Sequence, residues 1–293
     1  MTNFFGTKFS EARFFGYLAP CLGLLLCLTS LATLAQTQSE STPAPSATTI
    51  SPAEKRWELG VGIGGLTTPD YRGSKTNRSY IAPIPYVVYR GPVIRTDRDG
   101  VRGDFLRTDR MEFTASLGVS FTPDNHKNEL RQGMPELAST LEGGPALHIN
   151  LTGDSLREGL SLFLPVRAVM TVGKGSPQYI GLVSTPSLIY RQQLASQWHV
   201  NMRAGPMFAS GKYHNYYYTV EPQYALPERP TYDAGSGYSG FNTQIALTRR
   251  HGDFWYAFYG RYANLADTDF LDSPLVETRH NFTAGFAISW VLY

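Results

Sequence analysis

The segment WELGVGIGGL, residues 57–66, alternates large apolar side chains with small or acidic ones. Trp57, Leu59, Val61 and Ile63 occupy the odd positions, and Glu58 and glycines occupy the even positions between them. Successive side chains of a β-strand point to opposite faces. The alternation therefore predicts a strand with one apolar face and one face of small residues.

The same segment contains the spacing G-x-G-x-x-G, at Gly60, Gly62 and Gly65, which is typical of dinucleotide-binding proteins. Such a loop needs its glycines at the turn between a strand and a helix. Here the glycines lie within the predicted strand, and the following TTPDYRG cannot begin a stable helix. We expect no nucleotide cofactor and interpret the small residues as room for charged side chains of facing strands.

The two-residue period returns along most of the chain, for example in MEFTASLGVSFT, residues 111–122. Several runs are about 10 to 13 residues long, which fits a tilted membrane-crossing strand better than the roughly 5 or 6 residues of a soluble one. We predict an all-β fold over residues 54–293, a transmembrane antiparallel up-and-down β-barrel of 12 strands, or of 10 if region 92–107 forms none. The predicted strands are 57–66, 79–90, 92–97, 101–107, 111–122, 141–152, 158–172, 180–193, 197–217, 240–250, 254–263 and 280–292.

The apolar faces are expected to meet lipid and the polar faces to line the lumen. Aromatic residues make up 13% of the chain and gather at 215–219 and 254–262, where we expect rings at the level of the lipid headgroups. A periplasmic β-sandwich or lipocalin-like barrel, with the apolar face inside, is the alternative. DRDG (97–100), TGDS (152–155) and RHGD (250–253) are predicted hairpin turns. An even strand number places both termini in the periplasm.

The N-terminus has the layout of a secretory signal peptide, residues 1–35, with basic residues ahead of an apolar run and small residues at its end. An uncleaved membrane anchor is the alternative. Cys21 and Cys27 both lie in this segment, so the exported chain has no cysteine for disulfides or thiolate metal sites. Residues 36–53 are rich in Ser, Thr, Pro and Ala and are predicted to be a flexible linker.

No motif in the chain predicts a catalytic, cofactor-binding or metal site. The formal net charge of +2 gives no case for nucleic acid. The six histidines lack a metal-ligand spacing. GSKT (73–76) lacks the order of a phosphate-binding loop, so we expect a barrel loop there. Asp269 and Asp272 of DFLDSP (269–274) could hold a divalent cation, but a solvated loop is the favoured interpretation.

His148 and His199 fall on polar faces, where a serine could meet them in the lumen and support acyl hydrolysis. We favour instead a lumen network of paired charges, which would offset the cost of desolvating them. Its expected members, besides these histidines, are Glu58, Glu112, Glu142, Arg167 and Arg203. The chain is therefore predicted not to be an enzyme.

Several segments resemble the MltA-interacting protein family, also called MipA/OmpV. They are GVGIGGLTTPDYRGSK (60–75), IPYVVYR (84–90), NYYYTVEPQYA (215–225), YDAGSGYSGFN (232–242) and RYANLADTDFLDSPLVE (261–277). The resemblance implies a β-barrel in the outer membrane of Gram-negative bacteria. It also implies a scaffold that links a murein lytic transglycosylase to a bifunctional penicillin-binding protein in peptidoglycan growth.

A small-solute channel is the main alternative function, and a barrel lipid hydrolase is a weaker one. Expected partners are outer-membrane lipid, the two peptidoglycan enzymes and the barrel-assembly machinery. Tyr293 is out of phase with the apolar face that ends at Leu292, so we expect that machinery to recognise Trp290 and Leu292 instead.

Overall fold

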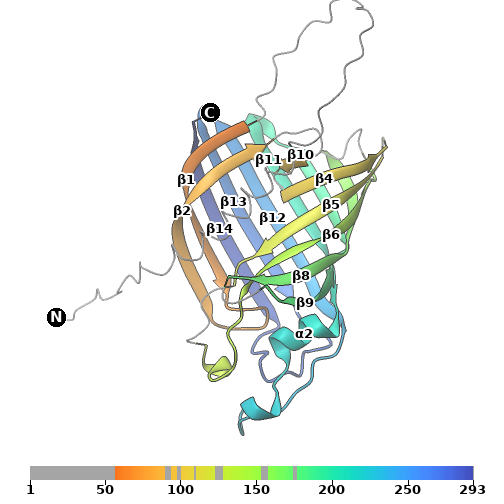
Figure 1. The fold of residues 1–293 in the computed structure, drawn as a ribbon. Coiled ribbons are helices and arrows are strands. Elements are labelled where there is room, and N and C mark those ends of the chain that lie inside the picture. The colour runs from red at the N-terminus through yellow and green to blue at the C-terminus, as the bar shows by residue number, and fades with distance from the viewer. Residues whose placement is uncertain are drawn as a thin grey trace, which may run out of the picture. The chain divides into compact units, whose positions relative to one another are not determined.

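One antiparallel sheet makes up almost all of the fold in the computed structural model (Figure 1). The structure describes residues 57–89, 94–97, 100–108, 110–122, 128–152, 158–173 and 177–292. The strands are β1 (Trp57–Pro69), β2 (Asn77–Tyr89), β3 (Ile94–Asp97), β4 (Gly100–Arg107), β5 (Met111–Ser120), β6 (Ser139–Asn150), β7 (Gly159–Pro165), β8 (Arg167–Val172), β9 (Tyr179–Ser184), β10 (Ser187–Gln193), β11 (Trp198–Ala209), β12 (Gly237–His251), β13 (Phe254–Asn264) and β14 (His280–Val291).

These segments amount to the 12 predicted strands, because two strands are each interrupted once. β6 pairs with both β7 and β8, which are separated by Val166 alone. β11 pairs in the same way with β9 and β10, which are separated by residues 185–186. The predicted strand count and β-barrel class are confirmed, including the weak region that forms β3 and β4.

The sheet brings the two ends of the chain together, because β1 pairs with β14 as well as with β2. The order runs β2-β1-β14-β13-β12-β11-β10-β7-β6-β5-β4-β3, so the two outermost strands, β2 and β3, are consecutive in the chain. The start of β1 and the end of β14 lie at one end of the barrel, and helix α2 (Gly211–Tyr218) lies at the other (Figure 1).

The strands turn apolar side chains outward and polar ones inward, as predicted. Val61 and Ile81 are exposed by 58% and 70%, whereas His148 and Ser161 are exposed by 0% and 2%. A soluble barrel or sandwich would show the reverse arrangement, so that alternative is wrong. An exterior of this kind is stable only against an apolar solvent such as a bilayer.

The glycines of the first strand serve a different purpose from the one predicted. A Cβ atom on Gly60 would lie 2.2 Å from the carbonyl oxygen of Trp290, and one on Gly62 would lie 2.2 Å from that of Ile288. Both oxygens belong to the paired strand β14. Glycine is therefore required here because the first and last backbones approach closely.

The predicted strand at 197–217 was too long, since β11 ends at Ala209 and α2 begins at Gly211. Within GKYHNYYY the buried residues are Tyr213, His214, Tyr217 and Tyr218, a spacing that repeats after four residues. This is the period of a helix with one buried face. These tyrosines lie in a protein core, so their predicted place in a headgroup belt is wrong, while Phe254 and Phe258 of β13 do face outward.

No helix in the described part of the chain is long and apolar enough to cross a membrane. The predicted signal peptide 1–35, the linker 36–53, His126 and Tyr293 lie outside the described residues, as do parts of the turns at 97–100 and 152–155.

Candidate functional site

Four segments close the end of the barrel opposite the start of β1 and the end of β14. We call residues 70–76, 128–138, 210–236 and 265–279 the outer cap. Its aromatic core is centred on Tyr218, whose ring stacks on Phe270 with centroids 3.7 Å apart and planes 5° apart. Both side chains are almost completely buried. The cap is therefore a packed structure, and its hydrophobic core continues onto strands β8, β9 and β11 of the barrel.

Hydrogen bonds join the first turn of the barrel to the last one within the outer cap. The Tyr71 hydroxyl donates to the Leu275 carbonyl at 2.7 Å. The Gly73 amide donates to Asn281 Oδ1 at 2.6 Å, and the Glu277 amide donates to the Gly73 carbonyl at 2.8 Å. The turn between β1 and β2 is thereby fixed against the chain that leads into β14.

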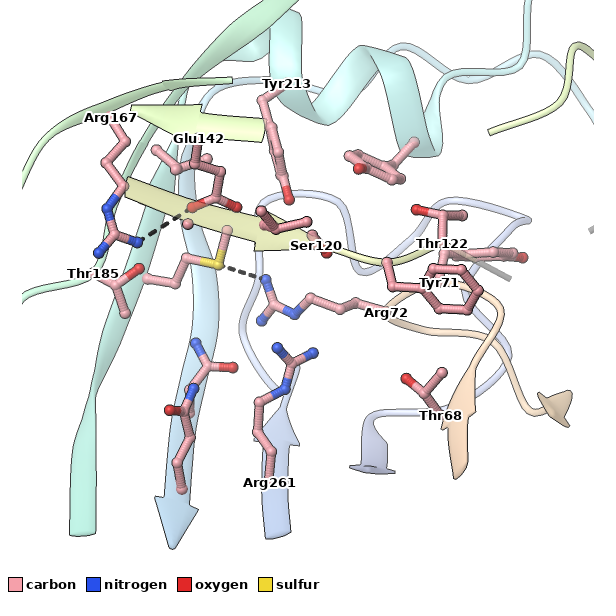
Figure 2. Close-up of a pocket in the computed structure, with 18 of the residues that line it drawn as sticks. Thr68, Tyr71, Arg72, Ser120, Thr122, Glu142, Arg167, Thr185, Tyr213 and Arg261 are labelled. Atoms are coloured by element: carbon pink, nitrogen blue, oxygen red, sulfur yellow. Dashed lines mark hydrogen bonds and ion pairs between the residues drawn. The ribbon is translucent and has the colours of Figure 1, made fainter. Parts of the chain in front are cut away.

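A cavity of about 290 Å³ lies beneath the outer cap (Figure 2). Its cap-side lining includes Tyr71, Arg72, Tyr213, Tyr217 and Tyr218. Its charged lining comprises Asp70, Arg72, Glu142, Arg167, Arg203 and Arg261. Four arginines thus accompany two carboxylates, which makes this part of the lumen electropositive.

Both carboxylates already hold an arginine. Glu142 Oε2 lies 3.3 Å from Arg167 Nη1, and Arg167 also donates from Nη2 to Ser116 Oγ at 2.7 Å. Asp70 Oδ1 accepts from Arg78 Nε at 2.6 Å. Arg72 and Arg261 therefore meet cavity carboxylates that are already paired with other arginines.

Arg72 and Arg261 point their guanidinium groups toward one another across the cavity (Figure 2). Arg72 donates to the Ser239 carbonyl at 2.5 Å and contacts Met207 Sδ at 2.8 Å, and its Nε is buried without a hydrogen-bond partner. Within the described ranges, neither arginine forms an ion pair. Burial, opposed by nearby tyrosines and reinforced by the like charge of Arg261, lowers the pKa of Arg72.

Tyr213 and Tyr217 of the cap are neutral phenols under ordinary conditions. Burial raises the pKa of Tyr213 to about 12, although Arg72 and Arg261 act in the opposite direction. Burial likewise raises the pKa of Tyr217 well above its usual value of 10. Their hydroxyls and rings border the cavity as polar and aromatic surface without adding charge.

The predicted members of the lumen network lie at several places along the barrel. Glu142 pairs with Arg167, whereas Glu58 pairs with Arg250 at 2.8 Å near the end of the barrel where β1 begins and β12 ends. The Arg203 guanidinium lies 5.1 Å from the centroid of the Phe163 ring. Glu112 is buried on β5, and His199 is half-buried on β11.

A histidine contacts a serine, as the sequence suggested, at His148. Its Nε2 lies 2.8 Å from Ser161 Oγ, within hydrogen-bonding distance. Both side chains are buried in the wall, and Ser161 Oγ also lies 3.4 Å from the Ile189 carbonyl. An acyl substrate has no access to a nucleophile in this position. The pair thus stabilises the packing of β6, β7 and β10.

GSKT (73–76) forms the turn between β1 and β2, as expected. In DFLDSP, Asp269 and Asp272 are exposed, but Phe270 and Ser273 are buried in the outer cap, so only part of the segment is solvated. The described residues contain no cluster of His, Cys, Asp or Glu that could hold a metal ion.

Comparison with known proteins identifies the family. A family model described as MltA-interacting protein MipA matches residues 61–292. The chain belongs to this family. A MipA-family chain of this architecture is a β-barrel outer-membrane protein.

Similar solved structures include the NanC porin, with 7% identity, a TM-score of 0.36, and coverage of 80% of this chain and 100% of that one. An outer membrane channel from Pseudomonas putida F1 has 10% identity, a TM-score of 0.34, and coverage of 83% and 100%. The Pseudomonas putida toluene transporter TodX has 10% identity, a TM-score of 0.33, and coverage of 81% and 90%. No curated protein matched this chain.

Proposed function

We propose that this protein is a scaffold in the outer membrane of Gram-negative bacteria that binds a murein lytic transglycosylase and links it to a penicillin-binding protein. The family match over residues 61–292 carries the proposal, because it includes nearly all of the barrel and its name refers to such an interaction. The role requires a stable surface and no chemical step by the barrel itself.

The architecture is compatible with a scaffold. Outer-membrane barrels have short periplasmic turns and longer extracellular loops. By this rule the outer cap is extracellular, and the end with the tight turn at Gly252 faces the periplasm, where peptidoglycan enzymes act. The packed cap also restricts free passage through the barrel.

Site-specific photocross-linking in intact cells tests the scaffold. A photoreactive amino acid at Asp253, exposed in the periplasmic turn, should capture a lytic transglycosylase or a penicillin-binding protein. The same group at Glu228, exposed in the outer cap, is the matched control and should capture neither enzyme. Folded barrel at normal abundance with neither enzyme cross-linked at Asp253 would overturn the scaffold.

A small-solute channel is the second candidate, and the electropositive cavity is the observation that favours it. A positive lumen raises the local concentration of anions. Purified barrel in planar bilayers should then give steady conductance with anions preferred over cations. Absence of conductance would exclude the channel and leave the scaffold unaffected.

A further inference from the structure

We propose that Arg72 and Arg261 together bind the acidic head group of a small organic anion inside the barrel. The inference rests on the cavity and is independent of the scaffold. It uses the same cavity as the channel candidate but requires binding only, with no passage of the ligand across the membrane.

The charge arrangement is the first argument. Two guanidinium groups that face each other repel, and this repulsion is costly where water is restricted. The cavity carboxylates are engaged by Arg167 and Arg78, as described above. An anion between Arg72 and Arg261 would convert the repulsion into two attractive contacts.

Hydrogen-bonding capacity is the second argument. A guanidinium presents five N–H donors in a planar fork that matches a carboxylate or a phosphate. The structure gives Arg72 a carbonyl and a thioether as partners and leaves its Nε buried without one. Arg261 forms no side-chain hydrogen bond among the described residues. Donors therefore remain available to two or more acceptor oxygens.

The aromatic residues of the cavity indicate the shape and polarity of the rest of the ligand. Tyr213, Tyr217, Tyr259 and Phe163 line the same cavity. Aromatic side chains are common in sites for small organic ligands, and here they accompany the charged residues of the lining. The volume of about 290 Å³ is nearly twice the roughly 150 Å³ that accommodates benzene. A compact cyclic carboxylate or phosphate monoester fits this description.

Calorimetric titration of the full-length barrel in detergent micelles tests the site. The probes are benzoate, cyclohexanecarboxylate and phenyl phosphate, with neutral benzamide as the uncharged match for benzoate. At least one acidic probe should bind saturably, and binding should weaken as salt is added. Benzamide should bind at least about tenfold more weakly, because charge-assisted hydrogen bonds are lost.

Variants then locate the binding. Arg261→Gln should weaken binding at least about tenfold, and Arg261→Lys, which keeps the charge but loses the fork, should lie between this variant and the wild type. Arg250→Gln removes the same charge outside the cavity and should bind like the wild type. Arg261→Gln should fold at least as well as the wild type on a heat-modifiability gel, since it removes a charge that faces Arg72.

Three results would overturn the site. They are unchanged affinity in folded Arg261→Gln, equal affinity for benzoate and benzamide, and no saturable binding by any acidic probe. Binding without conductance would reject only the channel. Cross-linking from Asp253 remains a separate measurement, so failure of the anion site and failure of the scaffold can be told apart.

Discussion

Arg78 donates two hydrogen bonds to Asp70, from Nε to Oδ1 at 2.6 Å and from Nη2 to Oδ2 at 3.3 Å. The Asp70 carboxylate is fully buried, and Asn128 Nδ2 donates to its Oδ2 at 3.0 Å. One carboxylate therefore bonds both to the start of β2, through Arg78, and to the cap segment after β5, through Asn128.

Asp70→Ala is expected to destabilise the outer cap by about 3 kcal/mol, because it removes the buried carboxylate that accepts hydrogen bonds from Arg78 and Asn128. The cap segments should become sensitive to limited proteolysis while the barrel still migrates as a folded species without boiling. Glu58→Ala, which breaks an ion pair at the opposite end, is the control. Equal protection of the cap in both variants would contradict this role.

Tyr71→Phe removes only the hydroxyl that donates to the Leu275 carbonyl. The expected loss is about 1 kcal/mol, the usual net value of a hydrogen bond, with some addition because the carbonyl stays buried. Hydrogen exchange of amides at 273–278 should accelerate. Tyr190→Phe, which loses an exposed hydrogen bond to Gln192, should leave that exchange unchanged.

The outer cap should lose stability in mild acid because of His214. Burial lowers the pKa of this fully buried imidazole below its usual 6.5, although the Gly235 carbonyl and Asp269 favour the charged form. The unfolded state then binds more protons as the pH falls below about 6.5. The neutral His214 therefore stabilises the cap fully above about pH 6.5. This stabilisation is progressively lost as the pH falls from about 6.5 toward the lower pKa of the folded state.

Thermal unfolding of the cap measured at pH 7.5 and pH 5.5 checks this dependence. The wild type should lose more stability over this interval than His214→Gln, in which the imidazole is absent. The neutral histidine donates from Nδ1 to the Gly235 carbonyl and pairs through Nε2 with the Ser239 hydroxyl, so the variant starts from a lower stability at pH 7.5. An identical change with pH in both proteins would exclude His214 as the source.

Gly60→Ala should impair closure of the barrel, since its Cβ would lie 2.2 Å from the Trp290 carbonyl oxygen. The Trp290 backbone is fixed by strand pairing and cannot move aside as a flexible side chain can. Gly64→Ala is the matched control on the same face of β1, where the nearest atoms, 3.3 Å away, belong to the Ile84 side chain. The fraction of heat-modifiable barrel should fall in Gly60→Ala alone. Equal folding of the two variants would contradict the close approach.

Much of the barrel could be predicted because side-chain alternation is a local property. Residues 57–66 show which side chains share a face without reference to any other strand. The reason for Gly60 could not be found in this way, since it depends on the path of β14. Helix α2 was missed because YHNYYY is short and aromatic, and its helical spacing becomes evident only from the buried side chains.

The cavity was predicted only in part. Glu142 and Arg167 were expected from their polar strand faces, and they do meet. Arg72 could not be predicted because it lies in a turn, where no strand period applies, and Arg261 because the aromatic residues around it dominate the pattern of its strand. A sequence assigns residues to faces, but the meeting of Arg72 with Arg261 depends on how the cap folds over the lumen.

The bonds between Gly73 and the chain near Glu277 and Asn281 also determine when the outer cap can form. Their two sides are more than 200 residues apart, at opposite ends of the barrel sequence. Contacts of this separation form late, because the intervening chain must first be ordered. The pairing of β1 with β14 spans a similar separation, so we expect the cap to be completed with the closure of the barrel, and a protease-resistant cap would be a marker of a barrel that has finished assembly.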